Sequence, residues 1–107
     1  MNFELFNQLY SEALESENLE LYVSERGWQE WMDNYSPKEI KDILNNIYTL
    51  ANNNLQNTRH VSRAEFSRYY HIPIRTLEDW ENEKRTPPIY VKMLIDYVQF
   101  TDYLNKD

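Results

Sequence analysis

The sequence predicts an all-α protein, a compact multi-helix domain with a helix-turn-helix unit in its C-terminal half. One observation is composition, because the 107-residue chain has one glycine and four prolines, too few for the many tight turns of an all-β protein. Another is periodicity, since apolar residues recur at helical spacing along several stretches. A third is the recurrence of residues that begin helices, at Asn18, Ser36 and Ser62. A chain of this length can bury one modest core.

The first part of the chain is expected to form two helices and a short helical turn. Apolar spacing predicts an amphipathic helix from Asn2 to about Glu15. Asn18 can cap a second helix, which Gly27 terminates, and a short turn should end near Asn34. We expect the large side chains of that turn to pack in the core rather than to form a ligand or partner surface. They are Trp28, Trp31 and Met32.

Ser36 to Glu39 is the clearest helix start in the first half. The stretch combines a capping serine, a proline at the first helical position and a glutamate that can complete a capping box. Apolar spacing carries this helix to about Ala51, before three consecutive asparagines. Two interpretations stay open for the next residues: the Ser36 helix stands alone, or Leu55 to Arg59 extends it.

Residues 62–82 predict two short helices joined by a tight turn. Ser62 followed by Glu65 indicates a capping box, and the helix it begins should run to about Tyr70. Pro73 is tolerated only in a first helical turn, so a second helix should begin there and end near Asn82. Such a pair forms a helix-turn-helix unit.

The second helix of this unit should expose one polar face. With Leu77 turned toward the core, Arg75, Asp79 and Asn82 point the opposite way. In a DNA-binding helix-turn-helix, outward residues near the start of the second helix reach base edges. Arg75 can bond a guanine edge with two hydrogen bonds, and Asp79 can accept one from cytosine.

Residues 61–88 resemble, without a gap, the helix-turn-helix of the Cro/C1-type (Xre-like) bacterial and phage repressors. The combination T-L-x-x-W-E followed by K-R-x-P carries the resemblance. Two glycines of the family's pattern are replaced, by His71 in the turn and by Glu83 after the second helix. His71 is therefore expected at positive φ, and either Glu83 or Asn82 should adopt a left-handed conformation. The matching residues are Val61, Ser62, Glu65, Phe66, Ile72, Thr76, Leu77, Trp80, Glu81, Lys84, Arg85 and Pro87.

The resemblance implies a repressor that binds double-stranded DNA as a homodimer and occludes a two-half-site operator. It also implies the usual setting of such proteins, the control of a phage, plasmid, toxin–antitoxin or other mobile-element operon. Glu81 should pair with an arginine of the preceding segment, and Arg59 and Arg68 are the candidates. The expected DNA-binding residues are Arg63, Arg68, Arg75, Thr76, Asp79, Asn82, Lys84 and Arg85.

The last predicted helix opens after Pro87 and Pro88 and carries more large apolar residues than one face can bury. Either two of its faces pack within the monomer or part of it forms a dimer contact.

The net charge of −7 is unevenly distributed. Residues 1–57, the acidic N-terminal region, hold ten acidic and three basic side chains, whereas residues 58–107, the helix-turn-helix region, hold eight of each. The two regions should share one continuous core, since no linker separates them. Acidic residues do not build cores, so five glutamates of the first region are expected to be exposed. These are Glu12, Glu15, Glu17, Glu20 and Glu25.

This charge supports a second hypothesis, in which the acidic face binds a protein partner. The protein would then be an inhibitor or adaptor, even a DNA-mimicking inhibitor of the anti-CRISPR kind, with the helix-turn-helix as scaffold or autoregulatory module. A third hypothesis is a helical structural module with no role in nucleic-acid binding.

Catalytic and cofactor chemistry is not expected. The chain has no cysteine, and His60 and His71 are its only histidines, so no metal site, cofactor or catalytic constellation is predicted. We expect turn or loop roles for both histidines, with a phosphate contact as the alternative. The absence of cysteine and of a long apolar run is compatible with a cytoplasmic protein without membrane segments.

Overall fold

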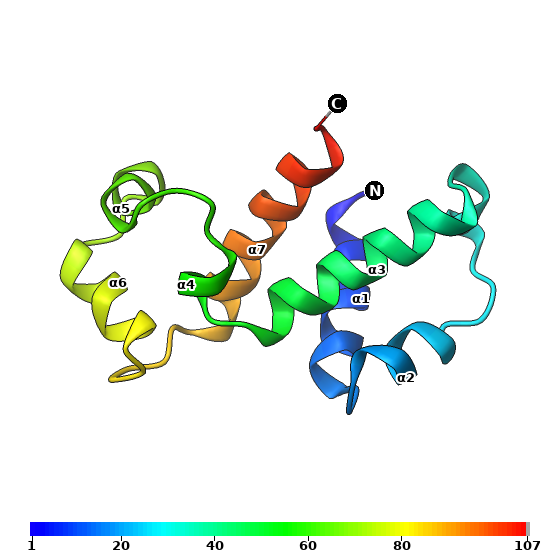
Figure 1. Ribbon diagram of the computed structural model, residues 1–107, viewed down its shortest axis with the longest axis horizontal. Helices are drawn as coiled ribbons and strands as arrows, with labels where there is room; N and C mark the ends of the chain where they lie inside the picture. The colour runs from blue at the N-terminus through cyan, green and yellow to red at the C-terminus, as the bar shows by residue number, and fades with distance from the viewer. Residues whose placement is uncertain (107) are drawn as a thin grey trace.

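The computed structural model describes residues 1–106, which fold into seven α-helices and one 3₁₀ helix with no strand among them (Figure 1). The predicted all-α class is thus confirmed. The described part of the chain measures 43 × 31 × 20 Å. In chain order the elements are α1 (Phe3–Glu15), α2 (Leu19–Ser24), the 3₁₀ helix η1 (Glu30–Asn34), α3 (Pro37–Asn52), α4 (Leu55–Thr58), α5 (Arg63–Tyr70), α6 (Ile74–Glu81) and α7 (Ile89–Leu104).

Helices α1, α2 and α3 enclose the larger of two apolar clusters, together with the second half of α7. Phe6 is fully buried at its centre, where its ring centroid lies 5.4 Å from Tyr10 and 5.2 Å from Phe100. Stacked and tilted aromatic pairs of this kind add to the gain from burial alone. The buried members of this larger cluster are Phe6, Leu9, Tyr10, Ala13, Tyr22, Ile43, Leu44, Ile47, Leu50, Ala51 and Phe100.

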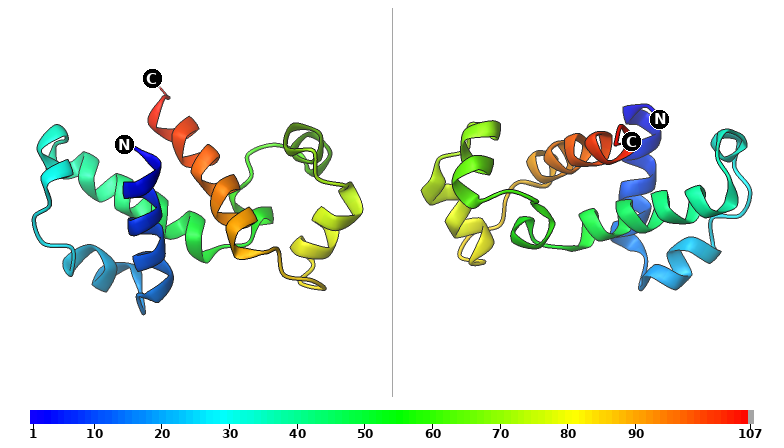
Figure 2. Two further views of the ribbon diagram at one scale, coloured as in Figure 1. Left: turned by 180° about the vertical axis from the view of Figure 1, so that it is seen from behind. Right: turned by 45° about the horizontal axis from the view of Figure 1, so that its top comes forward.

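The smaller cluster lies between the α5–α6 pair, α4 and the first half of α7. Its buried members are Leu55, Phe66, Leu77 and Ile95, one from each of the four helices. Helix α7 runs between the α5–α6 pair at one end of the molecule and α1–α3 at the other, as all views agree (Figures 1 and 2). It therefore contributes to both clusters.

This double role bears on the two alternatives for the last helix. Both of its sides pack within the monomer, because Ile95 belongs to the smaller cluster and Phe100 to the larger one. Its first turns nevertheless leave Ile89, Tyr90 and Leu94 exposed, at 66, 63 and 49 %.

Side-chain caps begin the helices where the sequence predicts them. Asn18 accepts a hydrogen bond from the backbone N–H of Leu21, and Ser36 and Glu39 form the complete capping box. Ser62 accepts from the backbone N–H of Glu65 in the same way. Within the described residues, however, the Glu65 carboxylate makes no return bond to Ser62, so only half of the second box is present.

Two expectations for the first half need correction, and one open alternative is decided. Trp28 is 67 % exposed rather than in the core, because it follows the left-handed Gly27 and lies outside η1. Glu12 is half-buried, since it forms an ion pair with Arg26. Helix α4 is a separate short helix capped by Asn54, not an extension of α3, because the extended backbone of Asn53 ends α3.

Candidate nucleic-acid interface

The turn between α5 and α6 is built around His71. This residue adopts φ 57° and ψ 39°, the left-handed conformation expected of it. Two hydrogen bonds between the residues around it hold this strained conformation. In the first, the Ile72 N–H donates to the carbonyl of Ser67 at 3.0 Å. The Ser67 hydroxyl donates in turn to the carbonyl of Ile72 at 2.6 Å. The turn therefore fixes the direction in which α6 leaves α5.

A second left-handed residue ends α6. Glu83 has φ 61°, whereas Asn82 stays at φ −90°, so the glutamate and not the asparagine takes this role. A non-glycine residue in this region costs roughly 1 kcal/mol or more. The turn is closed by the carbonyl of Asp79, which accepts hydrogen bonds from the backbone N–H groups of Lys84 and Arg85 at 2.9 and 3.2 Å.

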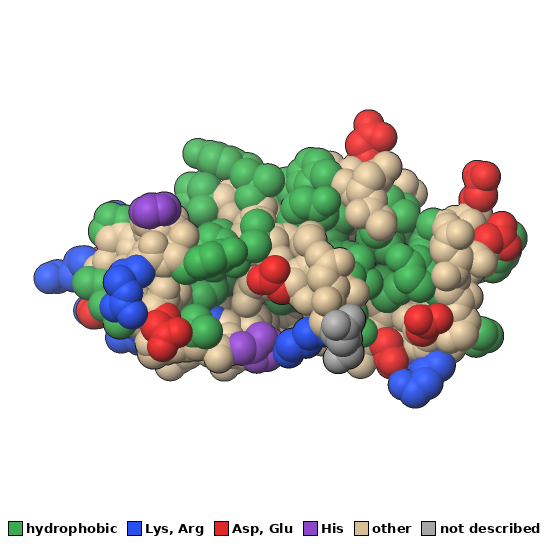
Figure 3. Space-filling model, turned by 90° about the horizontal axis from the view of Figure 1, so that it is seen from above, with side chains coloured by type: hydrophobic (Ala, Val, Ile, Leu, Met, Phe, Trp, Pro, Cys, Tyr) green, Lys and Arg blue, Asp and Glu red, His purple; other side chains and the backbone are tan. Residues whose placement is uncertain are grey.

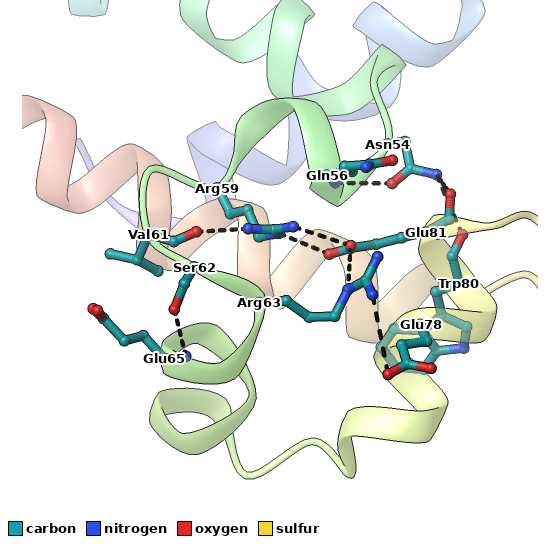
Figure 4. Close-up of polar contacts among 10 residues, drawn as sticks. All are labelled: Asn54, Gln56, Arg59, Val61, Ser62, Arg63, Glu65, Glu78, Trp80 and Glu81. Carbon is teal, nitrogen blue, oxygen red and sulfur yellow. Dashed lines mark hydrogen bonds and ion pairs between the residues drawn. The ribbon is translucent and has the colours of Figure 1, made fainter.

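Behind the exposed face of α6 lies a buried ionic cluster centred on Glu81 (Figure 4). The Glu81 side chain is fully buried, and Arg59 donates to both of its oxygens, from Nε at 2.8 Å and Nη2 at 3.2 Å. Arg63 Nε donates to Glu81 Oε1 at 2.9 Å. Arg59 was one of the two expected partners and is confirmed; Arg68, the other, is exposed and is not a partner.

The two arginines set the ionisation of Glu81. Burial raises the pKa of this carboxyl, but hydrogen bonds and charges from Arg59 and Arg63 outweigh burial and hold the pKa below its ordinary value. Glu81 is therefore charged at neutral pH and ties α6 to the start of α5 and to the residue after α4.

Asn54 adds a neutral link to the same region. Its side-chain amide donates to the carbonyls of Trp80 and Glu81, both at 3.2 Å, and so satisfies the C-terminal end of α6. Its side-chain oxygen accepts from the backbone N–H of Gln56 at the start of α4.

The outward face of α6 carries most of the residues predicted to read bases. Arg75 and Asn82 are exposed, and Arg75 makes no hydrogen bond or ion pair within residues 1–106. Thr76 is half-buried on the same helix. Asp79 is 22 % exposed and forms a 3.3 Å ion pair with Arg85, so a base would compete with that arginine for its carboxylate.

The cations predicted to contact DNA do not share one face. Arg63 is 31 % exposed and forms an ion pair with Glu81. It forms a second, longer ion pair with Glu78, at 4.0 Å. Arg68 is five residues further along α5, roughly 140° around the helix, and is exposed. Lys84 and Arg85 are exposed after α6. Arg75, Asn82 and Lys84 are thus exposed on α6 and just after it, whereas Arg63 is engaged with Glu81.

The surface charge differs between the two ends of the chain. In the view of Figure 3, lysine and arginine side chains gather at the end formed by α5 and α6, and acidic side chains dominate the opposite end. A phosphate backbone approaching the first end would meet the least negative part of this face.

The chain matches no protein-family model, no curated protein and no solved structure. In residues 1–106 no cluster of three or more His, Cys, Asp or Glu side chains could hold a metal ion. No helix in that range is long and apolar enough to cross a membrane.

Proposed function

We propose that the protein is a sequence-specific DNA-binding regulator that represses an operon of a phage, plasmid, toxin–antitoxin or other mobile element. In this proposal α5 and α6 are a helix-turn-helix of the Cro/C1 type, and α6 enters the major groove. The observation that carries it is backbone geometry: His71 and Glu83 stand where the family has glycine, and both adopt positive φ. Two separate positions thus keep the left-handed backbone that suits the family's glycines, although neither residue is glycine. This agreement supports a common architecture.

The exposed face of α6 gives the proposal its reading residue. Arg75 lies in the first turn of α6, exposed and without an intramolecular partner in the described chain. Its guanidinium is thus free to bond the guanine edge with two hydrogen bonds, a contact worth about 1–3 kcal/mol of discrimination. Asn82 and Lys84 are exposed just after the other end of α6, and Arg63 contacts α6 through Glu81.

The proposal is tested by selecting bound sequences from random duplex DNA at low salt and titrating the enriched site. Affinity should fall steeply as salt rises, because phosphate contacts release counterions. Arg75→Ala should relax discrimination at one base pair by about 1–3 kcal/mol. The matched variant Lys84→Ala should weaken all sequences alike. No enriched site, or equal effects of both variants, would refute the proposal. Arg63→Ala is a poorer test because it also removes a partner of Glu81.

A homodimer is part of the proposal, since such regulators bind two half-sites about one DNA turn apart. The exposed residues at the start of α7 supply an apolar surface for the second copy: Ile89, Tyr90 and Leu94. Leu94→Glu should convert a dimer to a monomer in sedimentation and weaken operator binding. A wild-type protein that is monomeric both free and on DNA would exclude this part.

A second candidate function is protein binding by the acidic end, as an inhibitor or adaptor. The observation that favours it is exposure around α2, where Glu17, Glu20, Glu25 and Trp28 all face solvent. A basic partner would gain both charge and aromatic contact there. Charge reversal at the three glutamates should abolish a complex recovered from host lysate, leave the fold intact and leave DNA binding unchanged or tighter. If the triple variant recovers the same partner in the same amount, this surface does not bind it and is only a solvated face.

A further inference from the structure

The chain after α6 turns back onto the helix that it leaves. The Lys84 N–H donates to the carbonyl of Asp79 at 2.9 Å. The Glu83 N–H donates to the carbonyl of Trp80 at 3.2 Å. With Glu83 at φ 61°, these two hydrogen bonds form the Schellman motif, a common helix end. The Arg85 N–H donates to the same Asp79 carbonyl at 3.2 Å, so the backbone holds Arg85 beside Asp79.

The side chains of Asp79 and Arg85 are paired as well. Asp79 Oδ2 lies 3.3 Å from Arg85 Nε, and neither residue forms another ion pair within residues 1–106. The Arg85 side chain is 60 % exposed and that of Asp79 is 22 % exposed. Exposed ion pairs add little stability, because water competes for both charges. The pair therefore forms in the free protein but opens at little cost when either group meets a better partner.

Asp79 also shares a face of α6 with Arg75. The two residues are four positions apart, so they lie on the same side of consecutive helical turns. A carboxylate next to the proposed guanine reader can accept a hydrogen bond from the amino group of cytosine in the major groove. Guanine and thymine present no amino group there. The Asp79 carboxylate thus has two alternative partners, Arg85 within the chain and a cytosine in a bound duplex.

We propose that Asp79 exchanges Arg85 for cytosine, so that a phosphate contact of Arg85 depends on the DNA sequence; this inference rests on the proposed function. When α6 meets cytosine, the amino group of the base replaces Arg85 at the carboxylate, and the freed guanidinium binds a backbone phosphate. Where guanine or thymine stands instead, Arg85 stays paired and neutralises no phosphate. Asp79 is then a specificity-determining residue, because a wrong base loses both its own contact and a phosphate contact.

Lys84 provides the comparison within the chain. It is exposed and forms no ion pair in the part of the chain that the structure describes. Its ammonium group is therefore free to contact the phosphates of any sequence. Each phosphate neutralised on duplex DNA steepens the slope of the logarithm of the association constant against the logarithm of salt concentration by about 0.9. This salt slope therefore counts the phosphate contacts of the two side chains separately.

The test measures the salt slope of the full chain on two duplexes, the enriched site and an unrelated sequence of equal length. Arg85→Ala should reduce the slope by about 0.9 on the enriched site and leave it unchanged on unrelated DNA. Asp79→Ala should steepen the slope on unrelated DNA by about 0.9, because it frees Arg85. It should also lower the preference for cytosine at one base pair about tenfold.

Two control variants separate the exchange from a general change of charge. Lys84→Ala should reduce the salt slope equally on both duplexes, since its contact does not depend on sequence. Glu83→Ala removes an exposed carboxylate that forms no ion pair within residues 1–106, so it should leave both slopes unchanged.

Two results would overturn the exchange while DNA binding stands. If Arg85→Ala changes the slope equally on both duplexes, or on neither, no phosphate contact of Arg85 depends on sequence. If Asp79→Ala keeps the full cytosine preference, the carboxylate reads no base. Failure to enrich any site would instead refute the proposed function, and the exchange with it.

Discussion

The two ends of the molecule are stabilised by different means. The larger cluster has eleven buried side chains, with aromatic rings in contact across α1 and α7. The smaller cluster has four, and a buried glutamate with two arginines joins its helices. Apolar burial stabilises in proportion to area, whereas a buried ion pair adds little net stability but is costly to break. The ion pairs at the α5–α6 end therefore fix the relative positions of its helices but add little to the free energy of unfolding.

Each end also contains one fully buried carboxylate, and the two are shifted in opposite directions. Asp96 of α7 accepts a 2.7 Å hydrogen bond from the hydroxyl of Tyr10 and pairs with Lys92. Burial raises the pKa of Asp96, and Lys92 and Tyr10 only partly offset it. Two guanidinium groups around Glu81 instead lower its pKa despite burial. Glu81 has two cationic partners and Asp96 one, and this difference contributes to the opposite directions of the two pKa shifts.

The largest effect is expected in the apolar end. Phe6→Ala should lower the free energy of unfolding by about 3–5 kcal/mol, because it removes a ring that is fully buried among other rings. Phe3→Ala is the matched control, since Phe3 is only partly buried and contacts Tyr97 edge-on. Urea denaturation measures both. Similar losses for the two variants would show that the larger cluster does not concentrate stability as its burial suggests.

The next effect should be confined to the other end. Removing both guanidinium groups, in Arg59→Ala with Arg63→Ala, leaves Glu81 buried and unpaired and should cost about 3 kcal/mol. Amide hydrogen exchange should show lost protection in α4, α5 and α6 and little change in α1 to α3. Adding Glu81→Leu to this double variant should recover at least half of the loss. No recovery would mean that the arginines stabilise by packing and not by pairing.

The contributions of the two carboxylates to the free energy of unfolding should change in opposite directions as pH falls. Because the folded-state pKa of Glu81 lies below its ordinary 4.5, its contribution is complete above that value and is lost as pH falls through the lowered pKa. The folded-state pKa of Asp96 lies above its ordinary 3.8, so its contribution grows as pH falls from 7 toward 3.8.

The measurement is unfolding free energy against pH for the wild type, Glu81→Gln and Asp96→Asn. The unfolding free energy of the wild type minus that of Glu81→Gln should decrease in acid. The same difference taken against Asp96→Asn should increase as pH falls from 7 to 3.8. Parallel trends for the two pairs would contradict the assigned shifts.

The smallest effect compares the two helix starts. Glu39→Ala should cost about 0.5 kcal/mol more than Glu65→Ala, because only the Glu39 carboxylate accepts a hydrogen bond from the backbone N–H of its capping residue, Ser36. Both residues occupy the third helical position and lose the same interaction with the helix dipole, so the difference isolates that hydrogen bond. Equal losses in thermal denaturation would show that the Ser62 box closes in solution.

Local signals predicted the helices well, because a cap needs only residues a few positions apart. Asn18, Ser36 and Ser62 begin helices in the structure as expected. Left-handed His71 was also expected, because the family that residues 61–88 resemble has glycine at this place in the turn. These features depend on backbone groups that the neighbouring sequence alone can satisfy.

Features that depend on distant partners were missed. The pairing of the fully buried Asp96 was not foreseen, because its partner Tyr10 is 86 residues away. The pairing of Arg63 with Glu81 was also not foreseen, because it is decided by how α5 packs on α6. A periodic pattern could have suggested Asp96, which lies between the buried Ile95 and Phe100 on one helix. The pattern could not have identified Tyr10 as the hydrogen-bond partner of Asp96.

Helix α7 carries a consequence for how the chain can be divided. Neighbouring residues Ile95 and Asp96 turn to different ends of the molecule, and Leu55 of the smaller cluster precedes residue 57. A cut after Asn57 would separate Phe6 from Phe100 and Leu55 from Leu77, so neither fragment would keep a complete interior. The α5–α6 pair is therefore not a transplantable module. A functional graft into another scaffold would have to carry the stretch from α1 to α7 as one piece.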